Sequence, residues 1–140
     1  MVKMRIMLVD DEERFLQTTQ KMLIKKGYDA LTATSGEECL VKLEQELVHV
    51  VILDVKMPGM GGVETLKKIK HLYPMVEVIM LTGHGTAESA VEGLKSGATD
   101  YLTKPANIDN IVAKAEEAFS RHLALEEKIR LVEAIKQAHI

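Results

Sequence analysis

The chain has 140 residues, a length that suits one domain with one hydrophobic core. Its 18 basic and 21 acidic side chains nearly balance, at a formal net charge of −3, and neither sign forms a block typical of a nucleic-acid-binding surface, so direct nucleic-acid binding is not expected. No apolar run approaches the roughly 20 residues that a membrane helix needs, so no membrane contact is expected. Cys39 is the only cysteine, which excludes an internal disulfide, favours a cytoplasmic location and indicates a small buried side chain on a helix.

Short apolar runs alternate with amphipathic segments along the whole chain. In Val50–Leu53, four consecutive apolar residues indicate a strand buried on both faces, and Pro58 with Gly59 prevents its continuation. The same criteria predict strands at residues 5–9, 28–33, 49–54, 76–82 and 101–103. Helical spacing predicts helices at residues 12–26, 35–47, 63–72 and 86–96, and a last helix from residue 107 to the C-terminus.

Residues that favour helix ends set the boundaries of these helices. Ser35 and Glu38 have the spacing of a capping box, and Asn107 begins the last helix. Gly27 and Gly97 follow their helices as C-cap glycines do. We expect the apolar residues of the helical stripes to face the sheet: Phe15, Leu16, Met22, Leu23, Ile24, Leu40, Val41, Leu43, Leu47, Val63, Leu66, Ile69, Leu72, Ala87, Ala90, Val91 and Leu94.

The alternation of strand and helix predicts an α/β fold with a parallel sheet covered on both faces. We expect five strands in the order 2-1-3-4-5, a doubly wound, flavodoxin-like arrangement with an extended C-terminal helix. In that order the first and third strands are neighbours, so Asp10, Asp11 and Asp54 meet at their carboxyl ends. Thr82 and Lys104 arrive at the same edge from the two strands beyond.

Three carboxylates crowded at one edge predict a bound cation, because like charges this close together cost free energy. An oxygen-only ligand set favours Mg2+, completed by water or phosphate. A carboxylate that attacks a phosphoryl group needs charge neutralised, and the ammonium of Lys104 and the hydroxyl of Thr82 suit the phosphoryl oxygens. The residues therefore predict an aspartyl phosphate on Asp54 rather than catalysis on a bound metabolite.

The chain resembles the receiver domains of two-component response regulators over about residues 4–120. The likeness rests on Asp10-Asp11 after the first strand, Asp54 in D-x-x-M-P-G, Thr82 in L-T-G and Lys104 in Y-L-T-K-P. Each fragment alone is weak: an Asp pair is more often a helix N-cap, and a lone threonine or lysine is more often a strand-end hydroxyl or a solvated side chain. All four in order make the likeness specific, and the wording LTGHGT and YLTKP points to regulators of the enhancer-binding or transcriptional kind.

This resemblance implies a role for each residue of the site. Asp54 would accept the phosphoryl group from the phosphohistidine of a sensor histidine kinase. Asp11, Asp54 and the backbone carbonyl of Lys56 would bind Mg2+, with Asp10 acting through water. Lys104, joined to the next residue by a cis peptide bond, would contact the phosphoryl group together with the threonine hydroxyl.

The resemblance also implies a conformational switch. Thr82 would move toward the phosphoryl group and Tyr101 would turn inward, remodelling the face formed by the fourth helix, the fifth strand and the fifth helix. Tyr101 could instead be a half-buried edge residue, because tyrosine suits a strand. The sequence departs from the usual pattern at Gly61, where many relatives carry Asp, and at Ala106, where Phe is usual.

Two further residues lie close to the predicted site. Lys56 and His84 each follow a site residue by two positions, near enough to influence the access of water. We hypothesise that they set the rate of dephosphorylation without being needed for phosphorylation. The alternative is that both are ordinary loop residues. The remaining histidines show no metal-ligand spacing and are assigned no role.

Residues 121–140 exceed what a receiver needs and are expected to form a helical extension or linker. Leu125, Ile129 and Val132 follow a 4-then-3 spacing amid charged residues, which suits pairing with another helix. Alternatively, this helix folds back on its own domain or frays. The expected partners are a sensor histidine kinase, an output domain or downstream protein, and a second copy bound through the switch face or through this extension.

A Mg2+-dependent phosphatase with an aspartyl nucleophile is the alternative from another class. Enzymes of the haloacid dehalogenase type carry D-x-D after the first strand, whereas this strand ends Asp10-Asp11-Glu12. A nucleotide-binding module is weaker still, since neither a phosphate loop nor a dinucleotide motif follows a strand. We therefore expect a signalling switch that is not a turnover enzyme.

Overall fold

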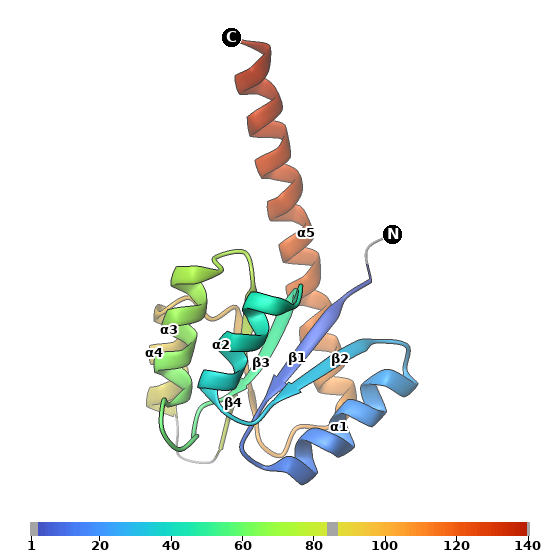
Figure 1. Cartoon of the computed structure of the whole chain (residues 1–140), viewed down its shortest axis with the longest axis vertical. Helices are drawn as coiled ribbons and strands as arrows, with labels where there is room; N and C mark the ends of the chain where they lie inside the picture. The colour runs from blue at the N-terminus through green and yellow to red at the C-terminus, as the bar shows by residue number, and fades with distance from the viewer. Residues whose placement is uncertain (1–2, 84–86, 140) are drawn as a thin grey trace.

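The computed structural model describes residues 3–83 and 87–139. They form a five-stranded parallel sheet with the order β2-β1-β3-β4-β5, covered by helices on both faces (Figure 1), so the predicted class and strand order are confirmed. The strands are β1 (Arg5–Val9), β2 (Asp29–Ala33), β3 (Val50–Asp54), β4 (Glu77–Thr82) and β5 (Asp100–Thr103). The helices are α1 (Glu13–Lys25), α2 (Gly36–Gln45), α3 (Gly62–Leu72), α4 (Ala87–Lys95) and α5 (Ile108–Ala138).

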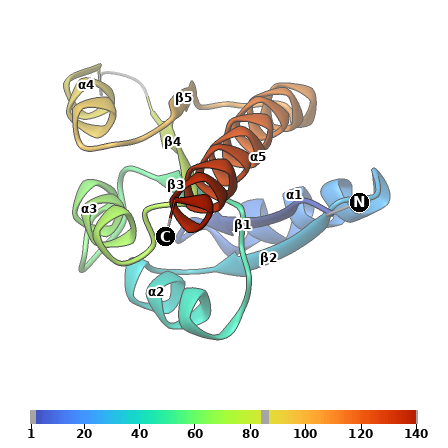
Figure 2. The same cartoon turned by 90° about the horizontal axis from the view of Figure 1, so that it is seen from above.

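Two helical layers enclose the sheet. Helices α1 and α5 lie on one face, and α2, α3 and α4 lie on the other (Figure 2). Successive side chains of a strand point to opposite faces, so Val51 and Leu53 of β3 join one core cluster while Val50 and Ile52 join the other. All residues of β3 are buried, as its continuous apolar run predicted.

The predicted helix ends form with one difference. The hydroxyl of Ser35 accepts a hydrogen bond from the backbone N–H of Glu38 at 3.1 Å, as a capping box requires. The carboxylate of Glu38, however, accepts from the N–H of Thr34 at 2.9 Å, one residue earlier than in the standard box. At the end of α1, Gly27 has φ +96°, a conformation that side chains with a Cβ rarely adopt.

The buried face of each helix is narrower than the pattern of apolar residues suggested. Leu16 and Leu23 of α1 are buried, but Met22 and Ile24 are exposed, because neighbours of Leu23 are turned about 100° around the helix axis. Seven residues expected to face the sheet are 41–70% exposed: Met22, Ile24, Val41, Leu47, Leu72, Val91 and Leu94. Cys39 is fully buried on α2, as expected.

Helix α5 is much longer than its contact with the domain. It has 31 residues, and those that the body buries are Ile111, Ala115, Ala118 and His122. Beyond His122 the helix continues away from the sheet (Figure 1), so the alternative in which it folds back on its own domain is wrong. None of the helices in the described ranges combines the length and the apolar character needed to cross a membrane.

Close backbone packing joins α3 to the end of β3. The N–H of Gly62 donates to the carbonyl of Val55 at 3.0 Å. A Cβ on Gly62 would lie 2.4 Å from the carbonyl oxygen of Asp54 and 2.6 Å from Cα of Val55, whereas a Cβ on Gly61 would meet nothing within 4 Å. The glycine at 62 is therefore required by the space beside the strand end.

Gly62→Ala is expected to lower the free energy of unfolding by at least about 2 kcal/mol, because the new methyl group would force the backbone of Asp54 and Val55 to move. The matched variant Gly61→Ala should cost less than about 1 kcal/mol, the usual scale of an N-cap change. Urea unfolding followed by circular dichroism measures both. Equal losses for the two variants would contradict the close packing.

Candidate functional site

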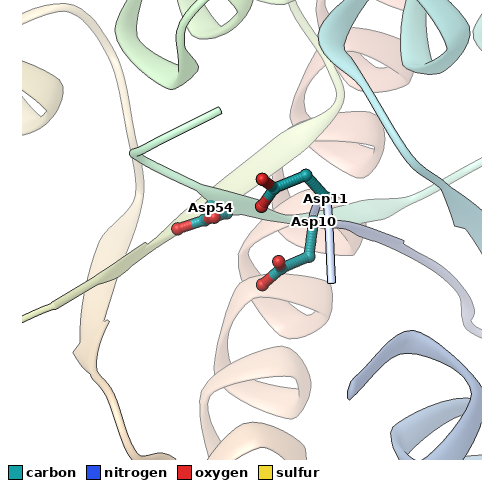
Figure 3. A group of neighbouring side chains, drawn as sticks. All are labelled: Asp10, Asp11 and Asp54. Carbon is teal, nitrogen blue, oxygen red and sulfur yellow. The ribbon is translucent and has the colours of Figure 1, made fainter. Parts of the chain in front are cut away.

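Three carboxylates gather at the carboxyl ends of the two central strands (Figure 3). Val9 of β1 pairs with Leu53 of β3, so the residues that follow them, Asp10 and Asp54, lie side by side. Asp10 and Asp54 are buried and Asp11 is exposed, and one oxygen of each carboxylate lies within 4.8 Å of the others. The structure thus brings together the three acids that the strand order predicted.

Lys104 supplies a positive charge to this cluster. Its Nζ lies 2.8 Å from Oδ2 of Asp10 and 3.5 Å from Oδ1 of Asp54. The backbone N–H of Lys104 donates to the carbonyl of Thr82 at 2.6 Å, which holds the residue beside the end of β4. The peptide bond between Lys104 and Pro105 is cis, as the resemblance implied.

Burial and charge alter the protonation of both partners. Burial, followed by repulsion from Asp10, raises the pKa of Asp54 from 3.8 to about 6, while the charge of Lys104 opposes this rise. Burial by itself would lower the pKa of Lys104, but the hydrogen bond and charge of Asp10 outweigh it and raise the pKa above its usual value. The lysine is therefore firmly charged, and the cluster still lacks positive charge.

Thr82 and Tyr101 lie on β4 and β5, as predicted. Among the described residues, neither forms a hydrogen bond to Asp54. Thr82 is buried, and its hydroxyl donates to the carbonyl of Leu102 on β5 at 3.3 Å. Tyr101, the preceding residue of β5, is 43% exposed. The hydroxyl of Thr82 is thus bonded to the neighbouring strand β5.

Of the two residues expected to influence the access of water, Lys56 lies in the part of the chain that the structure describes. The side chain of Lys56 is exposed, and its backbone N–H lies 3.4 Å from Oδ1 of Asp54. His84 lies outside the described residues.

Two residues near the cluster were not singled out from the sequence. Glu12 donates its backbone N–H to Oδ1 of Asp10 at 2.9 Å, and its carboxylate lies 3.7 Å from Nζ of Lys104. The ring of Phe15 lies 5.5 Å below the same Nζ, a cation–π distance. The position of Glu12 directly after the Asp pair could have indicated that it lies near the cluster. No sequence spacing indicated the same of Phe15.

The donor set suits a divalent cation. Asp10, Asp11 and Asp54 offer carboxylate oxygens and no nitrogen or sulfur, which is the chemistry that hard cations prefer. Lys104 neutralises part of the negative charge, and the exposed Asp11 leaves one side of the cluster open to solvent. The residues at this edge therefore fit a metal ion together with an anionic group.

The sequence profile of the response regulator receiver domain matches residues 6–116. The chain belongs to this family. It is the receiver domain of a two-component response regulator, and receivers of this kind are signalling modules.

Curated relatives of the receiver are transcriptional regulators. Transcriptional regulatory protein ZraR of Escherichia coli strain K12 is 39% identical over 115 residues, which are 82% of this chain and 26% of ZraR. DNA-binding transcriptional regulator NtrC of Salmonella typhimurium is 37% identical over 117 residues, 84% of this chain and 25% of NtrC. The chain therefore spans about a quarter of the length of these relatives.

Solved structures share the receiver fold. A CheY-like response regulator receiver domain protein from Methanospirillum hungatei matches with a TM-score of 0.83 and 33% identity, over 88% of this chain and 98% of that one. A chain described as adenylate cyclase from Rhodopirellula baltica matches with a TM-score of 0.89 and 28% identity, over 94% of this chain and 98% of that one. The wider coverage extends the second likeness into α5 beyond His122.

In the metal-free receiver, Asp54→Asn is expected to stabilise the fold by about 1 kcal/mol near pH 7.5. The folded-state pKa of about 6 exceeds the ordinary 3.8, so ionising Asp54 destabilises the fold. This free-energy penalty is absent below about pH 4, grows between about pH 4 and 6, and stays constant at higher pH. Urea unfolding in a chelator between pH 4 and 8 measures the gain, which should vanish at the acid end.

Asp11→Asn is the matched control, because Asp11 is exposed and is the smallest contributor to the raised pKa of Asp54. Its gain should be smaller. A pH-independent gain for Asp54→Asn would contradict the burial of an ionisable carboxyl.

Proposed function

We propose that this receiver is a phosphorylation-dependent switch in which Asp54 accepts a phosphoryl group from a sensor histidine kinase. One observation carries the proposal: the carboxylate of Asp54 lies at a strand end between two further acids and the ammonium of Lys104, 3.5 Å away. A carboxylate oxygen of Asp54 forms a bond to phosphorus while the P–N bond of the kinase phosphohistidine breaks. The electron pair of that bond returns to the imidazole nitrogen, and with a proton on the other ring nitrogen the kinase leaves with a neutral histidine.

Mg2+ is the cation that we assign to the acidic cluster. Asp11, Asp54 and the backbone carbonyl of Lys56 would hold it, and Asp10 would act through water. When bound, the ion supplies the positive charge that reduces repulsion between the carboxylates and an incoming phosphoryl group. The chain's own part is to hold its acids at the ends of β1 and β3, where they need no rearrangement.

Lys104 and Thr82 bind the phosphoryl oxygens in this proposal. Lys104 is already held at the site by Asp10 and needs only a small movement to contact an added oxygen. The hydroxyl of Thr82 donates to the carbonyl of Leu102 in the unphosphorylated protein. To donate to a phosphoryl oxygen it gives up that bond, which favours a structural response in β5.

The response would be read on the face formed by α4, β5 and α5. Val91, Leu94 and Tyr101 are exposed on α4 and β5 in this state. When Thr82 turns toward the phosphoryl group it vacates space beside β5, and Tyr101 turns inward to occupy it. The face then presents a different surface to an output domain or a downstream protein.

The names of the relatives suggest the output. ZraR and NtrC are named as transcriptional regulators, and this chain covers about a quarter of their length. We propose that residues 4–120 form the receiver, that residues 121–140 form a helical extension or linker, and that the output is the control of transcription. The balanced charge of the chain gives no reason to propose direct nucleic-acid binding by these residues.

Acetyl phosphate with Mg2+ is expected to add one phosphoryl group to the chain, located on Asp54 by peptide mass spectrometry, and Asp54→Asn should abolish it. Thr82→Val should slow the reaction roughly 10-fold through the loss of one donor to the phosphoryl group. Thr82→Ser keeps the hydroxyl and should retain most of the rate. Equal rates for the two variants would remove the proposed role of the hydroxyl.

A generic phosphomonoester separates this switch from the aspartyl phosphatase alternative. The receiver should release no product beyond one equivalent, whereas a phosphatase would release many. Multiple turnovers that depend on Asp54 would overturn the assignment.

Lys56→Ala and His84→Ala are expected to change the half-life of the aspartyl phosphate by a few-fold while leaving its formation intact. The exposed side chain of Lys56, two residues from Asp54, is placed to influence the approach of water. Decay of the phosphorylated protein in chelator, followed by phosphate-affinity electrophoresis, measures the half-life. Unchanged half-lives in both variants would contradict the hypothesis.

A further inference from the structure

A pocket lies at the edge of the sheet opposite the acidic cluster, where α5 leaves the body. Residues 47–49 directly precede β3 and residues 73–76 directly precede β4, so the parallel order brings both segments to this edge. Helix α5 adds His122 and Glu126 to the lining. Figure 1 shows the segment between α3 and β4 passing next to α5, and Nδ1 of His122 lies 2.7 Å from the carbonyl oxygen of Met75. We call this hollow the α5-root pocket.

The size and the walls of the α5-root pocket suit a small organic molecule. Its volume is about 410 Å³, within the roughly 300–1,000 Å³ range of ligand sites. Apart from its histidines and Glu126, its lining residues are apolar or aromatic. Tyr73 and Met75 are among them, and aromatic rings and methionine sulfurs pack favourably against an aromatic group. The pocket therefore offers space for an aromatic ring.

His49 brings a polar group into this apolar lining with its orientation fixed. The residue is only 5% exposed, and its Nδ1 accepts the backbone N–H of Arg5 at 3.0 Å. Its ring packs edge-on against the rings of Phe119 and His122, with centroids 5.1 and 5.3 Å away. A ring nitrogen that accepts a hydrogen bond carries no proton, so the proton of the neutral ring is on Nε2.

The Nε2–H group of His49 is a donor without an acceptor. Burial, followed by the charge of His122, lowers the pKa of His49 and keeps the ring neutral. In the described ranges, Nε2 of His49 has no hydrogen-bond partner, yet no fully enclosed side-chain nitrogen or oxygen there lacks one. Nε2 is therefore open to solvent, and the α5-root pocket, which His49 lines, provides the opening.

Glu126 supplies an acceptor to the same pocket. Its Oε1 lies 3.1 Å from Nε2 of His122, while its Oε2 has no partner in the part of the chain that the structure describes. A ligand carboxylate would be repelled by Glu126. A ligand ammonium could pair with Glu126 but would leave the N–H of His49 without an acceptor. A neutral amide, which carries a carbonyl oxygen beside an N–H group, satisfies both.

We propose that the α5-root pocket is a binding site for a neutral aromatic amide. The aromatic ring packs near Tyr73 and Met75, the carbonyl oxygen accepts from Nε2–H of His49, and the amide N–H donates to Glu126. Because Glu126 belongs to α5, the bound molecule contacts the body and the root of the long helix at the same time.

Titration of the full chain with benzamide, followed by two-dimensional ¹H–¹⁵N NMR, tests the site. Benzamide should shift the signals of residues 47–49, 73–76 and the turn of α5 around His122, with a Kd of roughly 1–10 mM, the range usual for so small a molecule. Benzoate has the same ring but a charged carboxylate, and it should bind at least about 10-fold more weakly. No shift of these signals up to roughly 20 mM benzamide would overturn the proposal.

Glu126→Gln tests the preference for a neutral ligand without altering the core. With the repelling charge removed, benzoate should bind within about 2-fold of benzamide. Glu127→Gln makes the same change one residue along α5, outside the pocket lining, and should leave the preference of about 10-fold intact. An equal effect of the two substitutions would overturn the assigned acceptor.

His49→Asn tests the donor. The carbonyl oxygen of asparagine can still accept the N–H of Arg5, but the Nε2–H is lost, so benzamide should bind roughly 5-fold more weakly. Thermal melts check that the variant is folded, and the Glu126 comparison decides if it is not. Unchanged affinity in a folded His49→Asn would overturn the assigned donor.

Two further probes test the class of ligand. N-acetyl-leucinamide imitates a peptide segment of a partner protein, and benzylamine carries an ammonium in place of the amide. Both should bind more weakly than benzamide. Tighter binding of either would overturn the aromatic amide as the occupant.

The α5-root pocket does not depend on the acidic cluster, so its failure and the failure of the phosphorylation switch are distinguishable. Asp54→Asn should abolish phosphorylation and leave benzamide binding unchanged. Glu126→Gln should leave phosphorylation by acetyl phosphate unchanged.

Discussion

The ion pair between Lys104 and the buried carboxylates of Asp10 and Asp54 is the constraint on which the site depends. Burying like charges side by side is unfavourable, and the lysine offsets only part of the cost. What remains is a pocket edge with excess negative charge, a raised pKa on Asp54 and one exposed acid, Asp11. Such an arrangement is stabilised by a divalent cation and an anion together better than by either alone. In the proposed function, this excess of negative charge is what would make the site respond to a cation and a phosphoryl group.

The topology of the sheet creates this excess of negative charge without disturbing the hydrophobic core. A parallel sheet with helices on both faces directs every strand end toward one edge, and the order 2-1-3-4-5 places β1 and β3 at its centre. The apolar residues that precede Asp10, Asp54 and Thr82 are buried and fix these strand ends in position, so Asp54 follows directly on the fully buried Leu53. The tight backbone contact at Gly62 closes the loop that follows. The two apolar core clusters thus lie away from the acidic edge of the sheet.

Much of this could be predicted from the sequence because it depends on local signals. Apolar runs ending in Asp, Thr and Lys, together with the rule of right-handed crossovers, were enough to bring Asp10, Asp11, Asp54 and Lys104 together. The contacts that escaped prediction join residues far apart in sequence. His49 and His122, which carried no recognisable spacing, pack with ring centroids 5.3 Å apart at the opposite end of the sheet. The exposure of Val91 and Leu94 also escaped, because helical periodicity gives the centre of a stripe more reliably than its width.

The continuity of α5 has a mechanical consequence. The helix begins at Ile108, four residues after Lys104, and runs unbroken to Ala138, a span of about 46 Å at the usual rise per residue. A single helix of this length behaves as a stiff lever arm whose short end lies near the acidic rim and whose long end stands clear of the domain. The domain packs against the helix as far as His122, so about 24 Å of it stands clear, and a tilt of about 5° would displace the far tip by about 2 Å.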